Sequence, residues 1–161
     1  MTIQTYQDPS VIRSVLAYRT VAVVGLSSNE LRASNFVGRY LQIQGYKVIP
    51  VNPREKIILG QTSYPSLTDI ADPVDIVNVF RKPDAVHAIA EEAVAIGAKC
   101  LWLQFGVISH EGAEIATAGG LDIIMDKCIK VEYARYFGRM HWLGFNTGRI
   151  VAKRSNQNNE L

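Results

Sequence analysis

A polar segment from Gly25 to Arg32 follows the first apolar run of the chain. Gly25 lets the backbone approach a ligand closely, and Ser27 and Ser28 add hydroxyl donors. Arg32 adds a guanidinium whose fork matches phosphate oxygens. If a helix follows, its free backbone N–H groups also attract an anion. The segment lacks both the GxGxxG fingerprint and the GK[ST] of a Walker loop, so it predicts a phosphate site of neither standard type.

The second apolar run ends in Asn52, Pro53 and Arg54. NAD sites commonly carry Asp or Glu at this point, where the carboxylate binds the ribose diol. A carboxylate would repel a phosphorylated ribose, whereas Asn52 and Arg54 would not. The segment therefore favours a nucleotide with an extra ribose phosphate, and Pro53 provides a rigid edge against which a flat base can pack.

Two further apolar runs also end in residues suited to a ligand. The third ends at Phe80 and is followed by Arg81 and Lys82, just before a proline that can open a helix. Cations at a helix start oppose the helix dipole, so their presence favours an anion between them and the helix. The fourth has Gln104 near its end and Gly106 directly after it, and a glycine there leaves room for an extended ligand arm.

Catalytic patterns are weak in this chain. His87, His110 and His141 fall at positions where structural roles are usual, and no paired carboxylates mark acid–base chemistry. Cys128 is the best candidate for a reactive thiol because the adjacent Lys127 favours the thiolate; a buried, inert thiol is the alternative. We therefore predict no catalytic residue and expect a binding protein.

Length and composition favour one globular domain. The chain has 161 residues, of which 48% are hydrophobic, enough for a core without a metal or disulfide. No apolar run approaches the roughly 18 residues of a membrane helix, and no signal-peptide pattern opens the chain. The two cysteines, Cys100 and Cys128, match no zinc spacing, so we expect reduced thiols, no metal site and a cytoplasmic location.

The apolar runs alternate with amphipathic segments, which is typical of alternating strands and helices. Asp8 and Pro9 are expected to open a leading helix, and Ser34 to cap the next one, which Gly45 ends. Residues 53–73, rich in proline, predict a long, partly irregular connection with a short helical turn near 67–70. The predicted strands are 20–25, 46–51, 75–80, 99–105 and 121–125, and the predicted helices are 9–16, 34–44, 83–97 and 109–118.

This alternation predicts an α/β fold: a single-domain, Rossmann-like, doubly wound sheet of about five parallel strands flanked by helices. In such sheets a ligand lies outside the carboxyl ends of the strands, where the strand order reverses. We expect this reversal between the first strand and the fourth.

The C-terminal part of the chain is basic. From Lys127 to Arg154 there are seven basic residues and one acid, Glu132. A solvated face is one interpretation, and an anionic ligand or partner is the other. Because aromatic residues alternate with these cations, RNA binding through this segment stays open as an alternative function.

The chain resembles the small stand-alone coenzyme A binding proteins, which are similar to the CoA-binding domain of the succinyl-CoA synthetase α subunit. The resemblance spans about residues 12–133 and rests on five segments in order, GLSSNELRAS, VIPVNPREKIILGQTSYPSL, VDIVNVFRKPDAV, LWLQFGV and MDKCIKVE. It departs from that family at Leu26, where many members have a small residue, and at Ala33, where proline is common. The resemblance implies a Rossmann-like fold that binds CoA.

The resemblance also implies roles for individual positions. Gly25, Ser27, Ser28 and Arg32 would hold phosphate, Asn52, Pro53 and Arg54 would lie near the adenosine end, Phe80 and Arg81 would flank the nucleotide, and Gln104 and Gly106 would border the pantetheine path. The candidate cofactor-binding residues are therefore Gly25, Ser27, Ser28, Asn29, Arg32, Asn52, Pro53, Arg54, Phe80, Arg81, Gln104 and Gly106.

The sequence thus predicts a CoA-binding or acyl-CoA-binding domain over 1–154 and a disordered tail over 155–161. An NADP-type oxidoreductase, or an acyl-CoA enzyme that uses the same crevice, is the alternative. The acyl group, the partner protein and a homo-oligomeric state are left open.

Overall fold

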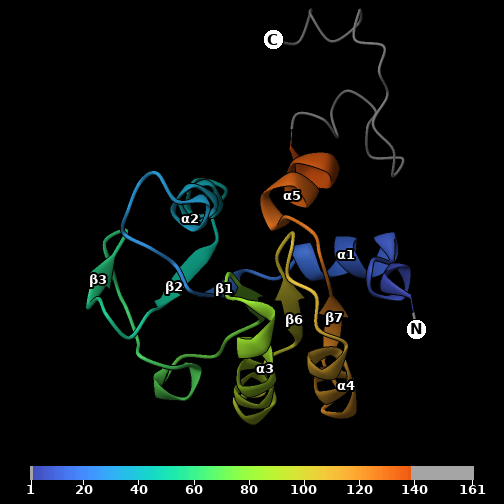
Figure 1. Ribbon diagram of the computed structural model, residues 1–161. Coiled ribbons are helices and arrows are strands. Elements are labelled where there is room, and N and C mark those ends of the chain that lie inside the picture. The colour runs from blue at the N-terminus through green and yellow to red at the C-terminus, as the bar shows by residue number, and fades with distance from the viewer. Residues whose placement is uncertain (1, 139–161) are drawn as a thin grey trace, which may run out of the picture.

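Five parallel strands form the central sheet in the computed structural model, which describes residues 2–138 (Figure 1). They are β1 (Thr20–Val24), β2 (Lys47–Val51), β5 (Ile76–Val79), β6 (Cys100–Leu103) and β7 (Asp122–Ile124). Nearly every residue of β1, β2, β5 and β6 is buried, as expected for a parallel sheet that is covered on both faces, whereas the edge strand β7 buries only Ile124. The structure confirms the predicted α/β fold and all five predicted strands.

The strand order is β2-β1-β5-β6-β7. β1 pairs with β2 on one side and with β5 on the other, so the order reverses between β1 and β5. The expectation of a reversal between the first strand and the fourth was wrong, because β5 is the third strand of this sheet. The chain crosses β1 once, between β2 and β5, and every later strand is added on the far side of β5.

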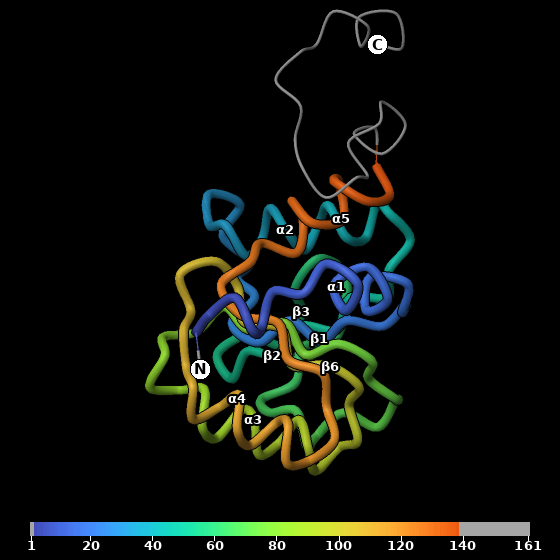
Figure 2. Tube along the Cα trace, turned by 90° about the vertical axis from the view of Figure 1, so that its right-hand side faces the viewer, coloured from blue at the N-terminus to red at the C-terminus, as the bar shows by residue number. Residues whose placement is uncertain are grey.

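Helices cover both faces of the sheet. α1 (Pro9–Leu16), α2 (Ala33–Ile43) and α5 (Ile129–Phe137) lie on one face, and α3 (Val86–Ala95) and α4 (His110–Ala118) lie on the other (Figures 1 and 2). Three single turns of 3-10 helix complete the helical elements: η1 (Ile3–Tyr6), η2 (Leu67–Asp69) and η3 (Pro83–Ala85). α5 is a helix that we did not predict, and it contributes to the site described below.

The core consists of two apolar clusters, one on each face of the sheet. Alternate residues of β1 supply them: Val21 and Val23 face α1, α2 and α5, whereas Ala22 and Val24 face α3 and α4. Trp102 of β6 is fully buried in the cluster that includes Val21 and Val23. This burial on both faces fixes the register of the strands and therefore the positions of their carboxyl ends.

Most helix boundaries follow the predicted signals. Asp8 caps α1 by accepting a hydrogen bond from the Ser10 N–H at 2.8 Å, and Ser109 likewise caps α4. The predicted cap at Ser34 was wrong. α2 begins at Ala33, and the Ser34 hydroxyl lies in its first turn, where it accepts the N–H of Ser27 at 3.0 Å. Ser34 therefore holds the preceding loop rather than the helix end.

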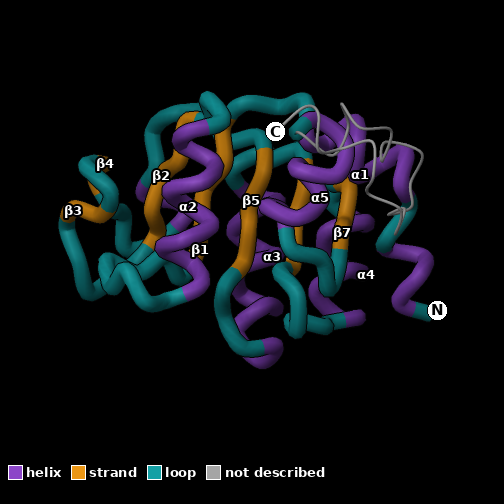
Figure 3. Tube along the Cα trace, turned by 90° about the horizontal axis from the view of Figure 1, so that it is seen from above, coloured by secondary structure: helices purple, strands orange, loops and turns teal. Residues whose placement is uncertain are grey.

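The connection from 53 to 73 is more ordered than we predicted. It contains a small antiparallel hairpin, β3 (Ile57–Ile58) with β4 (Gln61–Thr62), beside the β2 edge of the sheet (Figure 3). The short helical turn near 67–70 is present as η2. The strands of this hairpin have two residues each, too few to leave a periodic signal in the sequence.

Among the described residues, no helix is long and apolar enough to cross a membrane. Within the same residues, no group of three or more His, Cys, Asp or Glu side chains is placed to hold a metal ion.

Candidate functional site

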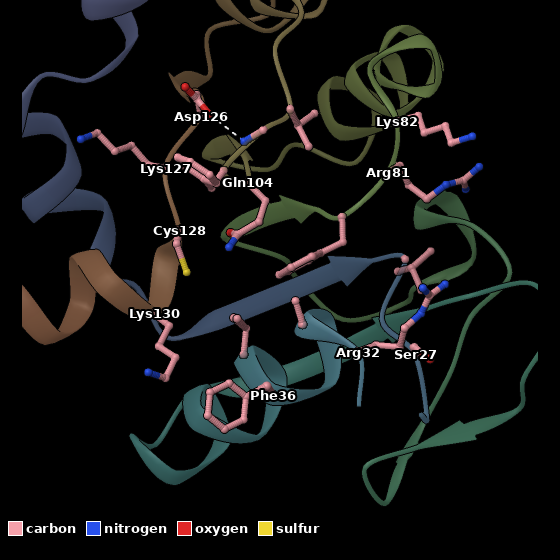
Figure 4. Close-up of a pocket in the computed structure, with 18 of the residues that line it drawn as sticks. Ser27, Arg32, Phe36, Arg81, Lys82, Gln104, Asp126, Lys127, Cys128 and Lys130 are labelled. Carbon is pink, nitrogen blue, oxygen red and sulfur yellow. Dashed lines mark hydrogen bonds between the residues drawn. The ribbon is translucent and has the colours of Figure 1, made fainter. Parts of the chain in front are cut away.

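A cavity of about 1450 Å³ lies at the carboxyl ends of the parallel strands, between the loops that follow them and the helices α2 and α5 (Figure 4). It includes the point between β1 and β5 where the strand order reverses, which is where α/β sheets commonly bind ligands. Ten of the twelve predicted site residues line it: Gly25, Ser27, Arg32, Asn52, Pro53, Arg54, Phe80, Arg81, Gln104 and Gly106.

Gly25 lies where the ends of three strands meet. Its backbone N–H donates to the Val51 carbonyl at 2.9 Å, and its φ of +91° is one that L side chains rarely adopt. A Cβ at this position would lie 2.4 Å from the Phe80 carbonyl oxygen. Glycine is therefore required by both conformation and space.

The loop after β1 is held by the start of α2. Ser27 donates its N–H to Ser34, and its carbonyl accepts the Asn35 side-chain amide at 2.8 Å. The N-cap residue Arg32 makes no side-chain cap, and its exposed guanidinium lines the cavity. Within the described residues, the N–H groups of Ala33 and Ser34 have no partner, so this helix start can donate to an anion.

Ser28 and Asn29 do not line the cavity. The Ser28 N–H donates to the Glu55 carboxylate at 3.3 Å, and the Asn29 side chain accepts the Leu31 N–H at 2.9 Å. Glu55 does line the cavity, although we did not predict it as a site residue. We looked for a carboxylate at the end of β2, whereas Glu55 comes four residues later and reaches the site because the loop folds back.

Asn52 and Arg54 play different parts. The Asn52 side chain donates to the Leu26 carbonyl at 2.9 Å and accepts the Arg54 N–H at 2.8 Å, so it joins the loops after β1 and β2. Arg54 is exposed on the cavity lining. Of the two residues, Arg54 is the one whose side chain is available to an anion.

Four cationic side chains on the cavity lining form no ion pair within the described residues. They are Arg32, Arg54, Arg81 and Lys82, and all four are exposed. Figure 4 shows Arg32, Arg81 and Lys82 on the same side of the close-up. Such a cluster at a helix start repels itself unless an anion lies between its members, which makes it a candidate phosphate site.

Gln104, on the cavity lining, belongs to a buried network of hydrogen-bonded amide groups. Gln104 is only 6% exposed, and its side-chain oxygen accepts the Asn78 amide at 3.2 Å and the Ile129 N–H at 3.3 Å. The Ile129 N–H belongs to the backbone at the start of α5 and can only donate, so it fixes which end of the Gln104 amide is oxygen. The Gln104 Nε2 group is left as a donor on the cavity lining, with no partner among the described residues.

Glycine is favoured at position 106 for a different reason than at position 25. Its φ is +87°, but no atom would lie within 4 Å of an added Cβ. Glycine at this position is favoured by the backbone conformation rather than by a close neighbour.

α5 brings part of the basic C-terminal segment into the same cavity. Lys127, Lys130 and Arg135 line it, so the lining holds seven cationic side chains against three carboxylates. The Lys130 ammonium lies 4.9 Å from the Tyr40 ring centroid and stacks on α2. From the sequence we left open whether these cations form a solvated face or meet an anionic ligand or partner. The buried positions Ile129, Glu132 and Tyr136 carry the helical spacing that could have revealed α5. Arg139, Arg149, Lys153 and Arg154 lie outside the described residues.

The two cysteines differ in environment. Cys100 is fully buried in β6, and burial, with a smaller contribution from Asp122, raises the pKa of its thiol well above the usual range. Cys128 is partly exposed, lines the cavity and occupies the N-cap position of α5. Only Cys128 is therefore placed to meet a ligand.

The three-layer fold, with a cationic cavity at the reversal point of a parallel sheet, defines a Rossmann-like protein. Residues 19–134 match the CoA binding domain family, and the chain belongs to this family.

The comparisons with individual proteins agree with this family. The chain is 40% identical over 116 residues to the uncharacterized protein YneT of Bacillus subtilis (strain 168), covering 72% of this chain and 86% of YneT. The structure of a hypothetical protein from Pyrococcus horikoshii OT3 is similar, with a TM-score of 0.77 and 36% identity over 80% of this chain and 91% of that one. The chain is also 26% identical to an ADP-forming acetate–CoA ligase of Archaeoglobus fulgidus, covering 69% of this chain but only 18% of the ligase.

Proposed function

We propose that this protein binds coenzyme A or an acyl-CoA in the cavity at the carboxyl ends of the strands. The observation that carries the proposal is the cluster of Arg32, Arg54, Arg81 and Lys82, which meets a helix start and lacks carboxylate partners among the described residues. CoA carries a diphosphate and a ribose phosphate at one end, which would supply the missing negative charge. Membership of the CoA binding domain family supports the same ligand.

The extended cavity also suits a ligand with two different ends. The cationic side would take the nucleotide, with Pro53 and Phe80 available to pack against the base. Figure 4 shows Gln104 apart from Arg32, Arg81 and Lys82, and Gln104 and Gly106 would border the pantetheine arm. A cavity of about 1450 Å³ exceeds the roughly 300–1,000 Å³ of common small-molecule sites, which favours a long ligand.

We further propose that the protein acts by binding rather than by catalysing a reaction on a separate substrate. Glu55 and Asp126 are the cavity carboxylates that contact loop backbone, through the N–H groups of Ser28 and Gly106. Neither carboxylate can exchange a proton with a histidine in the cavity, because no histidine lines it among the described residues. This geometry is compatible with a protein that senses CoA, carries it or presents it to another protein.

The proposal is tested by thermal unfolding and titration calorimetry with CoA, dephospho-CoA, NAD and NADPH. A ligand at a hundred times its Kd stabilises a protein by about 2.7 kcal/mol, which is readily visible as a rise in Tm. We expect CoA to stabilise most and dephospho-CoA less, because the latter lacks the ribose phosphate. Equal shifts from CoA and NAD would overturn the proposal, and a larger shift from NADPH would favour the oxidoreductase alternative.

A further inference from the structure

We propose that Cys128 accepts the acyl group of a bound acyl-CoA, by exchange of one thioester for another. The inference rests on the proposed function, because it requires the thioester end of the ligand to reach the start of α5. It assigns a reactive role to a side of the cavity that the phosphate-binding cluster does not explain.

Cys128 is held in place by the strand beside it. The Lys127 carbonyl, one residue earlier, accepts the Trp102 indole N–H at 2.8 Å. The Ile129 N–H, one residue later, donates to Gln104 at 3.3 Å. These two bonds fix the backbone on either side of Cys128 against β6. In Figure 4 the Cys128 sulfur and the Gln104 amide point toward the same region of the cavity.

Gln104 is the independent sign that a ligand atom belongs there. Its side chain is more than nine-tenths buried, and its oxygen already accepts two hydrogen bonds. The Nε2 donor lies on the cavity lining and has no hydrogen-bond partner within the described residues, so it is available to a ligand. An acceptor oxygen on the ligand would satisfy it.

The first turn of α5 supplies more donors at the same place. Of its N–H groups, that of Ile129 binds Gln104 and that of Glu132 binds the Cys128 carbonyl at 3.0 Å. Those of Lys130 and Val131 have no partner in the described part of the chain, and both residues line the cavity. Cys128 provides no side-chain cap, so its thiol is not committed to the helix.

Together these groups are suited to a thioester carbonyl. The oxygen would lie among the Gln104 Nε2 donor and the free N–H groups of α5, which stabilise the negative charge that develops on it during attack. The Cys128 sulfur, which lies on the cavity lining, is the nucleophile.

The exchange is balanced without a further reactant. The Cys128 sulfur forms a bond to the acyl carbon, and the bond from that carbon to the CoA sulfur breaks with its electron pair on the CoA sulfur. The proton lost by Cys128 ends on the CoA thiol. Nothing is oxidised or reduced, and because one thioester replaces another the acylated protein forms in quantity when acyl-CoA is in excess.

The test is intact-mass analysis of the full chain after incubation with excess acetyl-CoA. We expect one acetyl group per chain on Cys128, released by neutral hydroxylamine as a thioester would be, and no modification of the buried Cys100. Cys128→Ala should abolish the adduct. An amide on a lysine, which hydroxylamine leaves intact, or an adduct that survives Cys128→Ala, would overturn the proposal.

Gln104→Glu separates the oxyanion role from a structural one. The glutamate keeps an acceptor for Asn78 and Ile129 but replaces the Nε2 donor with a carboxylate oxygen. Loss of one such donor commonly slows acyl transfer about 10²–10³-fold, so the maximal rate of acylation should fall by that factor. An unchanged maximal rate would remove Gln104 from the reaction.

Failure of this proposal is distinguishable from failure of the proposed function. Thermal unfolding with CoA on the same preparation reports binding alone. A rise in Tm without any acylation would refute the exchange and leave CoA binding intact. No rise in Tm and no acylation would refute both.

Discussion

The Nδ1 atom of His87 on α3 lies 2.9 Å from the Glu111 carboxylate on α4, so a titratable pair joins the first turns of these two helices. Glu91, one turn along α3, lies 3.4 Å from the other ring nitrogen. The hydrogen bond with Glu111 is the main cause that raises the pKa of His87 above its ordinary value of 6.5.

This raised pKa predicts how stability varies with pH. A group whose pKa is higher in the folded state contributes stability that is complete below its unfolded pKa and is lost as pH rises through the folded pKa. We therefore expect wild type to exceed His87→Gln in stability most below about pH 6.5. The difference should shrink at more alkaline pH. Urea unfolding of both proteins across this range checks it, and a difference that grows with pH would contradict the assignment.

Gly25 and Gly120 form a matched pair of positions for testing how closely the Gly25 backbone approaches Phe80 where the strand order reverses. Their φ values are +91° and +85°, so alanine strains the backbone at both by about 1–2 kcal/mol. Only at Gly25 would the new Cβ also meet a backbone carbonyl, that of Phe80, at 2.4 Å. Gly25→Ala should therefore destabilise by several kcal/mol more than Gly120→Ala in urea unfolding. Equal losses would mean that β1 and β5 separate easily at this end.

Asp126 holds the loop after β6 to the start of α5. Its carboxylate accepts the Gly106 N–H at 2.6 Å, and its own φ of 60° lies in the left-handed region, which Asp and Asn tolerate better than most residues. Asp126→Ala loses both advantages and should destabilise the protein by about 2–3 kcal/mol. Asp126→Asn keeps an acceptor and the same backbone preference, so its loss should be smaller. Denaturant unfolding of the three proteins decides the order.

Variants of Arg81 and Arg13 distinguish a specific contact with the ligand from a general effect of positive charge. Arg81 lines the cavity beside Gly25, whereas Arg13 is exposed on α1 and stacks over the Tyr136 ring at 5.5 Å. If CoA phosphate meets Arg81, Arg81→Ala should weaken binding roughly ten- to hundredfold, because a hydrogen bond to a charged group contributes about 1.5–3 kcal/mol. Arg13→Ala should leave the Kd for CoA nearly unchanged in calorimetry. The reverse order would place the phosphates elsewhere.

Local patterns in the sequence determined the elements and much of the cavity lining. Strands that are buried on both faces give continuous apolar runs in the sequence. Asp8, Ser109 and Gly45 mark helix ends because capping interactions involve only residues close together in the chain. Because parallel strands share one carboxyl edge, the residues after each run were expected to meet. Ten of the twelve chosen positions do line one cavity, although their contact with a ligand stays a prediction.

Only the tertiary structure decided which partners those residues meet. Ser34 was chosen as a cap from its position, but a serine hydroxyl binds whichever N–H the fold brings near, and here that is the Ser27 N–H in the preceding loop. Glu55 enters the site because a loop folds back, and Lys130 joins it because α5 packs beside α2. The reversal point likewise depends on which strand pairs with β1, and that choice is made by contacts between residues far apart in the chain, which no local pattern records.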